Sequence, residues 1–273
     1  MAAAGADAHA VSGRVHRVLV AELRAGDVEV IGPEAHHLIN VLRVKPGASV
    51  EAFDGAGSVA AGSVARVNRH TLTLQLEEPR VAGTEARLRV PVGVALLKSD
   101  KLTDVVRQCT ELGAAHFQLL VTQHADVASL SPSRLQRLRR VAEEAARQSG
   151  RATVPVVSDP VALSDFVWEG AALVAHPYTD LSLAEVWPVG AGAAAASTAD
   201  VGAAATSAAA GAALTSTAAA VTVITGPEGG FSAAEVAQLE ERGAVGVRFG
   251  PRILRAETAP VALVSALLLP EGH

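Results

Sequence analysis

The sequence predicts an α/β protein of two domains, a small β-barrel followed by a larger domain with a mostly parallel sheet. Its 273 residues exceed the usual length of one compact domain. Residues 14–90 resemble short strands broken by turns, whereas strands and helices alternate from residue 90 onward. Hydrophobic residues make up 49% and aromatic residues only 3%, so the cores must be mainly Val, Leu, Ile and Ala. We place the two domains at residues 12–85 and 88–270.

The first domain is predicted from short alternating segments. The expected elements are a strand at 28–30, a short helix at 34–44, a hairpin at 49–53 and 58–67, and a strand at 71–76. The turn at 54–60 also matches the G-x-G-x-x-A pattern of dinucleotide-binding loops. Because that pattern needs a helix after it and residues 63–67 alternate like a strand, we interpret the segment as a hairpin turn.

The second domain is predicted from buried strands that alternate with amphipathic helices. Strands are expected at 90–97, 117–121, 154–157, 173–175, 221–225 and 245–249. Helices are expected at 100–112, after the N-cap Ser131 and the following Pro132, at 232–242 and at 258–269. Residues 189–220 are almost entirely Ala, Gly, Ser, Thr and Val, which indicates a flexible insertion without chemistry.

Composition excludes several classes of protein. The single cysteine, Cys109, cannot form an internal disulfide, and no paired Cys and His spacing predicts a zinc site. The sequence has neither a long apolar segment nor a signal peptide, so we expect a cytoplasmic protein without a membrane partner. The net charge of -5 means that any site for a polyanion must come from local clusters of basic residues.

A glycine-rich turn follows the strand expected at 221–225. Its sequence, residues 226–230, is Gly-Pro-Glu-Gly-Gly, and Ser232 with Glu235 then forms the pattern of a helix capping box. In open α/β sheets, ligands bind at the carboxyl ends of strands, where glycines let the backbone approach closely. The segment therefore predicts a ligand-binding loop, with a merely tight turn as the alternative.

A second turn follows the strand expected at 245–249. It begins with Gly250-Pro251 and carries Arg252, Arg255 and Glu257 before an apolar helix. Charged side chains crowded at a strand end are costly unless they are paired or used. The pattern predicts a functional site, and a structural ion pair between Arg255 and Glu257 is the alternative.

Five segments together resemble the RsmE family of SPOUT methyltransferases, the 16S rRNA (uracil-1498-N3) methyltransferases. They are HHLINVLRV at 36–44, TELGA at 110–114, QSGR at 148–151, GPEGG at 226–230 and GPRILRAET at 250–258. The last two are the most specific, while Arg107-Gln108 and Arg147 depart from residues common in the family. The resemblance implies a PUA-like β-barrel that binds RNA, a SPOUT domain with a deep trefoil knot, S-adenosyl-L-methionine as methyl donor, and a homodimer.

The resemblance also implies which residues act. The donor would lie against both turns, largely through backbone groups, at Gly226, Glu228, Gly230, Phe249, Gly250, Ile253, Leu254 and Thr258. The target nitrogen, N3 of uracil, is a weakly acidic imide whose proton must leave before or during methyl transfer. We expect Arg255 to stabilise negative charge on the flanking carbonyl oxygens, and Glu257 to act as a base or to orient Arg255. No metal is expected.

RNA is expected to be held by local basic groups. Between residues 131 and 151, six arginines and two glutamates leave an excess of four positive charges, although a solvated helix face is the alternative. The candidate contacts are Arg43, Lys45, Lys98, Lys101, Arg134, Arg147 and Arg151. We interpret His36 and His37 as structural, and His176 as a turn residue in preference to a pocket residue.

The expected function is methylation of N3 of one uridine in 16S rRNA, with the 30S ribosomal subunit and a second copy of the chain as partners. Three alternatives are kept: an RNA-binding module without catalysis, a SPOUT methyltransferase acting at another RNA site, and an enzyme that binds a nucleotide phosphate. The last is disfavoured because the sequence lacks G-x-x-x-x-G-K-[ST] and a true Rossmann fingerprint.

Overall fold

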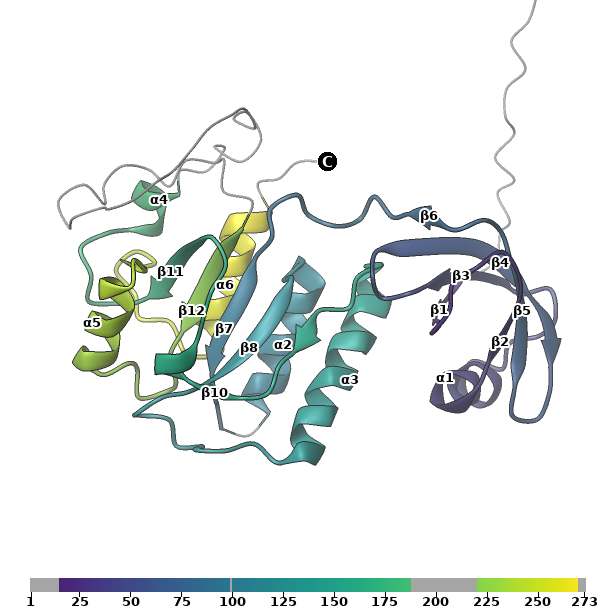
Figure 1. Cartoon of the computed structure of the whole chain (residues 1–273), viewed down its shortest axis with the longest axis horizontal. Helices are drawn as coiled ribbons and strands as arrows, with labels where there is room; N and C mark the ends of the chain where they lie inside the picture. The colour runs from purple at the N-terminus through teal and green to yellow at the C-terminus, as the bar shows by residue number, and fades with distance from the viewer. Residues whose placement is uncertain (1–14, 99, 188–219, 270–273) are drawn as a thin grey trace, which may run out of the picture. The chain divides into compact units, whose positions relative to one another are not determined.

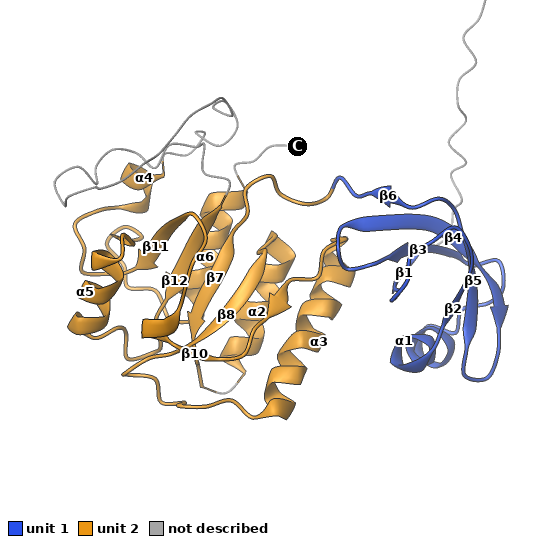
Figure 2. Cartoon of the chain, in the orientation of Figure 1, with its two compact units in different colours: residues 1–83 blue, residues 84–273 orange. Residues whose placement is uncertain are grey.

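The computed structural model describes residues 15–98, 100–187 and 220–269. They belong to two compact units, residues 1–83 and 84–273 (Figure 2). The insertion predicted at 189–220 lies outside the described residues except for its last residue, Ala220.

The N-terminal unit contains one six-stranded sheet and a short helical segment (Figure 1). Its elements are β1 (His16–Leu19), β2 (Gly26–Val30), α1 (Gly32–His36), the π-helical η1 (His37–Val41), β3 (Ser49–Phe53), β4 (Ser58–Val67), β5 (Leu72–Leu76) and β6 (Arg80–Val81). The strand order is β1-β3-β4-β5-β2, with β6 paired to β4. Because β1 and β2 are the two ends of this path, closure of the sheet into a barrel stays a prediction.

Alternation of side chains explains this sheet. In β5, Leu72, Leu74 and Leu76 are buried, while the residues between them are not, as the period of a strand requires. The predicted hairpin turn is confirmed, since the chain enters β4 directly and the Asp54 carboxylate accepts the backbone N–H groups of Ala56 and Ser58 at 2.7 and 3.0 Å. A dinucleotide-binding loop is thereby excluded. The helix expected at 34–44 is present, but its second half is π-helical and ends at 41.

The C-terminal unit is an α/β domain (Figure 1). Its strands are β7 (Pro91–Ala95), β8 (His116–Val121), β9 (Val156–Val157), β10 (Val161–Ala162), β11 (Ala171–Ala175), β12 (Val221–Thr225) and β13 (Val245–Val247). Its helices are α2 (Lys101–Leu112), α3 (Pro132–Ser149), the 3-10 helix η2 (Leu163–Asp165), α4 (Leu183–Val186), α5 (Ala233–Glu241) and α6 (Thr258–Leu268). The strands run parallel in the order β10-β8-β7-β12-β11-β13, with β9 paired to β8.

The sheet is covered on both faces. One core cluster joins one face of β7, β8, β11 and β12 to α2, α3 and α6, while a second joins the opposite face to η2 and α5. In β12, Val223 belongs to the first cluster and the adjacent Ile224 to the second. A strand buried on both faces is mostly apolar, which is why most of the expected strands are nearly continuous hydrophobic runs.

Local signals set the helix ends. The Ser131 side chain accepts the backbone N–H of Arg134 and caps α3, and Ser232 with Glu235 forms the predicted capping box of α5. Helix α2 ends at Gly113, whose φ of 111° is left-handed. The sequence reading missed β1, β6, β10, η2 and α4, which are short and lack a periodic pattern.

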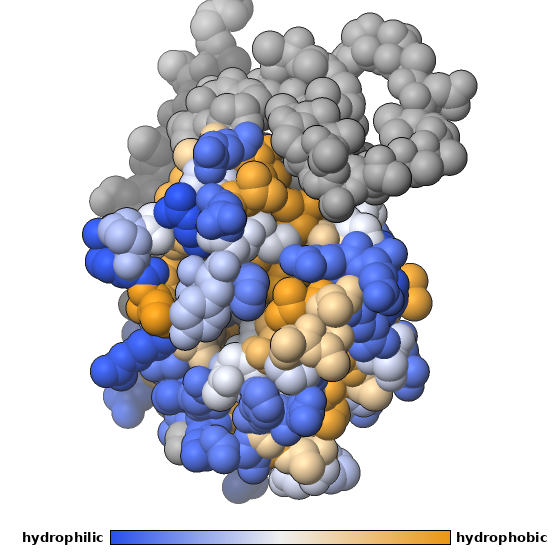
Figure 3. Space-filling view, turned by 90° about the vertical axis from the view of Figure 1, so that its left-hand side faces the viewer, coloured by the Kyte–Doolittle hydropathy of each residue, from blue (hydrophilic) through white to orange (hydrophobic). Residues whose placement is uncertain are grey.

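The surface of the described residues is mixed in character. Figure 3 views the side that carries α5, where hydrophilic residues cover much of the face and hydrophobic residues are exposed in smaller areas between them. Within the described ranges, no helix is both long and apolar enough to cross a membrane.

Candidate active site

Four neighbouring strands of the parallel sheet end beside one cavity. The strands β7, β12, β11 and β13 are adjacent and parallel, so their carboxyl ends lie along the same edge. The segments that follow them line a cavity of about 430 Å³. This is the position at which open α/β sheets bind ligands, and the volume is that of a small-molecule site.

The first wall of the cavity is the glycine-rich turn after β12. Gly230 has a φ of +72°, and a Cβ added to it would meet no atom within 4 Å, so its backbone is open to the cavity. A Cβ on Gly229 would lie 2.9 Å from the Cβ of His124, so only glycine fits there. The Glu235 carboxylate accepts the backbone N–H of Gln123 at 2.7 Å, which ties the helix after the turn to the end of β8. The turn is therefore held rigidly.

The second wall is the loop between β13 and α6. Its apolar lining consists of Phe249, Ile253 and Leu254, and Ile253 is 68% exposed. Arg255 and Glu257 also line the cavity, and the side chain of Arg255 is 84% exposed whereas that of Glu257 is 23% exposed. The nearest ion-pair atoms of these two residues, Arg255 Nη1 and Glu257 Oε1, are 3.9 Å apart. The two groups are thus too far apart for a hydrogen bond.

Glu257 has a closer cationic neighbour, Lys101, at the start of α2. Lys101 Nζ lies 3.4 Å from Glu257 Oε2 and 3.0 Å from Glu228 Oε1. Glu228 Oε1 also accepts the backbone N–H of Lys98 at 3.3 Å. One ammonium therefore bridges a carboxylate from each of the two turns.

The pKa values of this bridge are displaced in opposite directions. The hydrogen bond to Glu228 outweighs partial burial and raises the pKa of Lys101. Burial favours the neutral form of Glu228, but hydrogen bonds from its own backbone N–H, from Lys101 and from Lys98 outweigh burial and lower the pKa of this carboxyl. Lys101 thus stays cationic and Glu228 stays anionic at neutral pH.

Comparison with known proteins gives this cavity a context. Residues 84–268 match the RNA methyltransferase domain family, and residues 30–77 match the RNA methyltransferase PUA domain. The chain is 32% identical over 258 residues to the ribosomal RNA small subunit methyltransferase E of Synechocystis, covering 93% of this chain and 78% of the relative. The same protein of Mycobacterium bovis is 32% identical, with 89% of this chain and 86% of the relative covered.

The chain belongs to the ribosomal RNA small subunit methyltransferase E family. A solved structure of a family member, from Neisseria gonorrhoeae and bound to S-adenosyl methionine, resembles the chain with a TM-score of 0.76 and 25% identity. That likeness covers 93% of this chain and 97% of the other. The resemblance inferred from the five sequence segments is confirmed, as are the mostly parallel α/β fold and a PUA-like domain.

Most residues that the family resemblance assigned to the donor line the cavity. These are Gly226, Glu228, Gly230, Phe249, Ile253 and Leu254. The two residues expected to be catalytic, Arg255 and Glu257, line the cavity as well. Gly250 lies within the second loop and Thr258 is the first residue of α6, but neither lines the cavity. Their part in donor binding stays a prediction.

The sequence reading missed several lining residues. His176 lines the cavity from the carboxyl end of β11, so its interpretation as a turn residue alone was incomplete. Tyr178 and Arg248 also line it, as does Arg252, which the sequence placed in the second turn without a specific role. Lys101, expected to bind phosphate, lies here between two carboxylates. Adjacent parallel strands place their following residues together, so the strand end before His176 was a usable signal.

The basic residues of this chain that were expected to bind RNA differ in their surroundings. Arg43 and Lys45 are exposed on the N-terminal unit, and Arg43 has a left-handed φ of 53°. Lys98 Nζ lies 2.7 Å from Asp126 Oδ2, and Arg134 donates to the carbonyl oxygen of Leu97. Arg147 is half-buried and forms an ion pair with Glu144 on its own helix at 2.8 Å.

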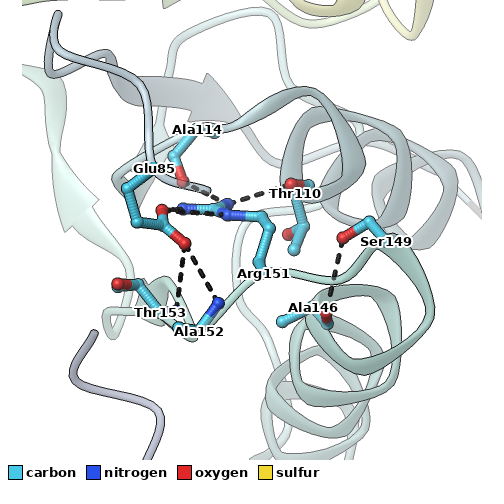
Figure 4. A network of polar contacts seen from close by, with 8 residues as sticks. All are labelled: Glu85, Thr110, Ala114, Ala146, Ser149, Arg151, Ala152 and Thr153. Carbon is cyan, nitrogen blue, oxygen red and sulfur yellow. Dashed lines mark hydrogen bonds and ion pairs between the residues drawn. The ribbon is translucent and has the colours of Figure 1, made fainter. Parts of the chain in front are cut away.

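Arg151 requires a correction, because it is buried and, as Figure 4 shows, surrounded by polar groups of its own protein. Its Nη1 donates to the carbonyl oxygens of Thr110 and Ala114, both at 2.9 Å, and its Nη2 lies 2.7 Å from Glu85 Oε2. The prediction that Arg151 binds RNA was therefore wrong. The residue joins α2 and the end of α3 to the start of the C-terminal unit.

No group of three or more His, Cys, Asp or Glu side chains in the described parts of the chain could hold a metal ion. Cys109 is free and buried, and burial raises the pKa of its thiol. It is packed in the core as a small hydrophobic residue.

Proposed function

We propose that the chain transfers a methyl group from S-adenosyl-L-methionine to N3 of one uridine, uracil-1498, in 16S rRNA of the small ribosomal subunit. The proposal rests on the 430 Å³ cavity, which is lined by residues of the two turns most specific to this methyltransferase family, 226–230 and 250–258. The name of the relatives and the S-adenosyl methionine bound to the Neisseria protein support it.

The residues of the cavity fit such a donor. The open backbone at Gly230 leaves room for close approach of a ligand, and the exposed side chain of Ile253 offers an apolar surface that a flat adenine ring would cover. Glu228 and Glu257 present carboxylates suited to a cationic ligand. When bound, S-adenosyl-L-methionine supplies an electrophilic methyl group on a sulfonium.

The cavity also narrows the choice of base. Lys101 is excluded because its raised pKa keeps it protonated, and Glu228 because hydrogen bonds hold its carboxylate and lower its pKa. Apart from the arginines, Glu257, His176 and Tyr178 remain among the titratable lining residues. We assign the base to Glu257, whose carboxylate takes the N3 proton of uracil, with the ammonium of Lys101 3.4 Å away holding it in position.

Arg255 is suited to the charge that proton removal creates. Its guanidinium is highly exposed and makes no hydrogen bond to Glu257, so its donors are available to an incoming base. The uracil anion carries its charge on the two carbonyl oxygens beside N3, and a planar guanidinium can donate to such oxygens. We assign that stabilising role to Arg255.

Further features of the proposal come from the family resemblance and from the positions of basic residues. We propose that residues 12–85 form a closed PUA-like barrel that binds RNA, with Arg43 and Lys45 on phosphates, and that 88–270 form the catalytic SPOUT domain. Lys98, Arg134 and Arg147 are proposed as additional phosphate contacts. A deep trefoil knot, a homodimer and a cytoplasmic location belong to the same proposal. Strand β12 lies between β7 and β11, which both come earlier in the sequence, and this order is compatible with a knotted path.

The function can be tested in cells and with purified protein. Deleting the gene should remove N3-methyluridine from the expected position in 16S rRNA, and the wild-type gene should restore it. Purified protein should transfer labelled methyl groups to 30S subunits or free rRNA lacking the modification. Retained modification in the deletion strain would refute the target, and no binding of S-adenosyl-L-methionine by calorimetric titration would refute the activity.

A pair of variants tests the choice of base. Glu257→Gln keeps the size of the side chain and removes its basicity, so methyl transfer should fall by roughly 100-fold or more. His176→Gln in the same cavity should leave most of the rate. The opposite ranking at saturating donor and RNA would assign the base to His176.

A further inference from the structure

A second cleft, of about 240 Å³, lies in the N-terminal unit, and none of the residues proposed above to bind the donor or RNA lines it. It is lined by Gly32, His36, Asn40, Arg69 and His70. Two backbone segments form it, the helical segment α1–η1 and the turn between β4 and β5.

The scaffold of the cleft is fixed without help from its polar side chains. Ala35 and Leu38 anchor the helical segment in the core, which leaves His36 and Asn40, four residues apart, on the cleft side. The opposite turn is closed by Asn68, whose backbone N–H donates to the Thr71 carbonyl oxygen at 2.9 Å and whose Nδ2 donates to the Thr71 hydroxyl at 3.1 Å. The residues at the tip of this turn are therefore not needed to close it.

The polar side chains of the cleft have no hydrogen-bond or ion-pair partner among the described residues. His36, Asn40, Arg69 and His70 are all exposed, and none makes a hydrogen bond or ion pair with another residue that the structure describes. By contrast, Arg66 in β4, on the same hairpin, is paired with Asp27 at 3.8 Å. A rigid cleft whose polar groups are all unpartnered offers them to a ligand.

The backbone of this region also has unusual geometry. Residues 37–41 form a π-helix, a rare conformation that occurs frequently at functional sites. Arg43, just beyond it, is the one described non-glycine residue with a positive φ. Both features lie in the HHLINVLRV segment at 36–44, and no residue of this segment lines the cavity of the C-terminal unit.

The chemistry of the lining favours one class of ligand. A guanidinium donates to a phosphate, an amide donates and accepts at the edge of a base, and imidazole rings stack on a base or donate to it. No carboxylate lines the cleft. Phosphate and an unstacked base occur together in single-stranded RNA, whereas an acidic peptide would leave the amide and the rings without matching groups.

We propose that this cleft binds one single-stranded nucleotide of the rRNA substrate, with its phosphate on Arg69 and its base against His36, Asn40 and His70. The identity of the RNA rests on the proposed function. Binding here anchors the substrate through the N-terminal unit, so loss of the cleft weakens RNA binding and leaves the chemical step intact.

The test compares the full-length protein with three variants by fluorescence anisotropy of a labelled 16S rRNA fragment that contains the target. Arg69→Ala should weaken binding about tenfold and lower the salt dependence by about one released ion, while Asn40→Ala should weaken it about fivefold. Arg66→Ala, which removes the same charge on the same hairpin, should change affinity less than about twofold. Unfolding temperature and donor affinity should not change in any variant, because the substituted side chains are exposed.

Several results would overturn the proposal. Equal losses for Arg69→Ala and Arg66→Ala would reveal a general charge effect, and normal RNA affinity in both Arg69→Ala and Asn40→Ala would show that RNA does not enter the cleft. The proposal would also be overturned if Asn40→Ala weakened heparin binding as much as it weakened RNA binding. Failure of the proposed function looks different: the wild-type protein would then bind the fragment with the expected sensitivity to Arg69 but transfer no methyl group to it.

Discussion

Replacing Arg151 with alanine should destabilise the C-terminal unit strongly. The side chain of Arg151 is 6% exposed, and it donates to two carbonyl oxygens and to the carboxylate of Glu85. The substitution leaves the carbonyl oxygens of Thr110 and Ala114 without this donor and Glu85 without its cation (Figure 4).

The magnitude follows from burial. Breaking a buried ion pair from one side costs about 3–5 kcal/mol. Glu85 is 27% exposed and still accepts the backbone N–H groups of Ala152 and Thr153, so water and these donors offset part of the loss. We therefore expect the lower limit, about 3 kcal/mol, which corresponds to a fall of about 6–12 °C in unfolding temperature for a domain of this size.

Urea unfolding followed by circular dichroism measures this change. The matched control is Arg140→Ala on α3, the helix that precedes Arg151; this exposed arginine should alter stability by less than about 0.5 kcal/mol. RNA affinity of Arg151→Ala, measured where the variant is fully folded, should equal that of wild type. A stability loss below about 1 kcal/mol, or an RNA defect in a fully stable variant, would refute the structural role of Arg151.

Three further predictions concern the cavity and the fold. Gly230→Val should weaken binding of S-adenosyl-L-methionine more than about tenfold, because its φ of +72° strains a branched residue whose side chain would enter the cavity; unchanged affinity in a folded variant would contradict this. Arg255→Ala should lower kcat by about 100-fold at nearly constant donor affinity, and a pure binding defect would argue against its assigned role. Burial lowers the pKa of His116 from its ordinary value of 6.5, so the unfolded chain binds this proton more readily and stability falls as pH drops below 6.5. His116→Gln should make urea-unfolding stability less dependent on pH between about 7.5 and about 5.5, and an unaltered slope would exclude this source of acid sensitivity.

The fold was predictable where local chemistry determines it. The strand at 221–225 could be placed because all five of its residues are Val, Ile or Thr, the β-branched types that favour a buried parallel strand. Helix starts could be placed because Ser131 and Ser232 satisfy backbone N–H groups that the helix itself leaves free. The order of strands could not be predicted, since nothing in the local sequence of β12 states that it lies between β7 and β11.

The two turns of the site could be predicted from the sequence, but the ion-pair partner of their carboxylates could not. Glu228 and Glu257 were found from their own loops, each of which follows a strand of the sheet. Their shared partner, Lys101, precedes Glu228 by more than a hundred residues and reaches it because β7 is the neighbour of β12. The local sequence offered Glu257 only a nearby arginine, so the ion pair considered as the alternative was with Arg255, whose Nη1 lies 3.9 Å from Glu257 Oε1.

The same long-range pairing explains why counting charges along the sequence overstated one RNA surface. The six arginines between residues 131 and 151 gave a local excess of four positive charges, but acidic residues distant in sequence neutralise several of them. Arg137 pairs with Asp100 and Arg139 with Asp159, each at 3.1 Å. Among the described residues, Arg140 is the one arginine of this group without a polar partner. A cation that its own protein leaves unpaired is a better indicator of a phosphate site than a cluster of cations, because an ion pair must be broken before a paired arginine can bind RNA. That criterion favours two residues as RNA contacts, Arg140 on α3 and Arg69 in the cleft of the N-terminal unit.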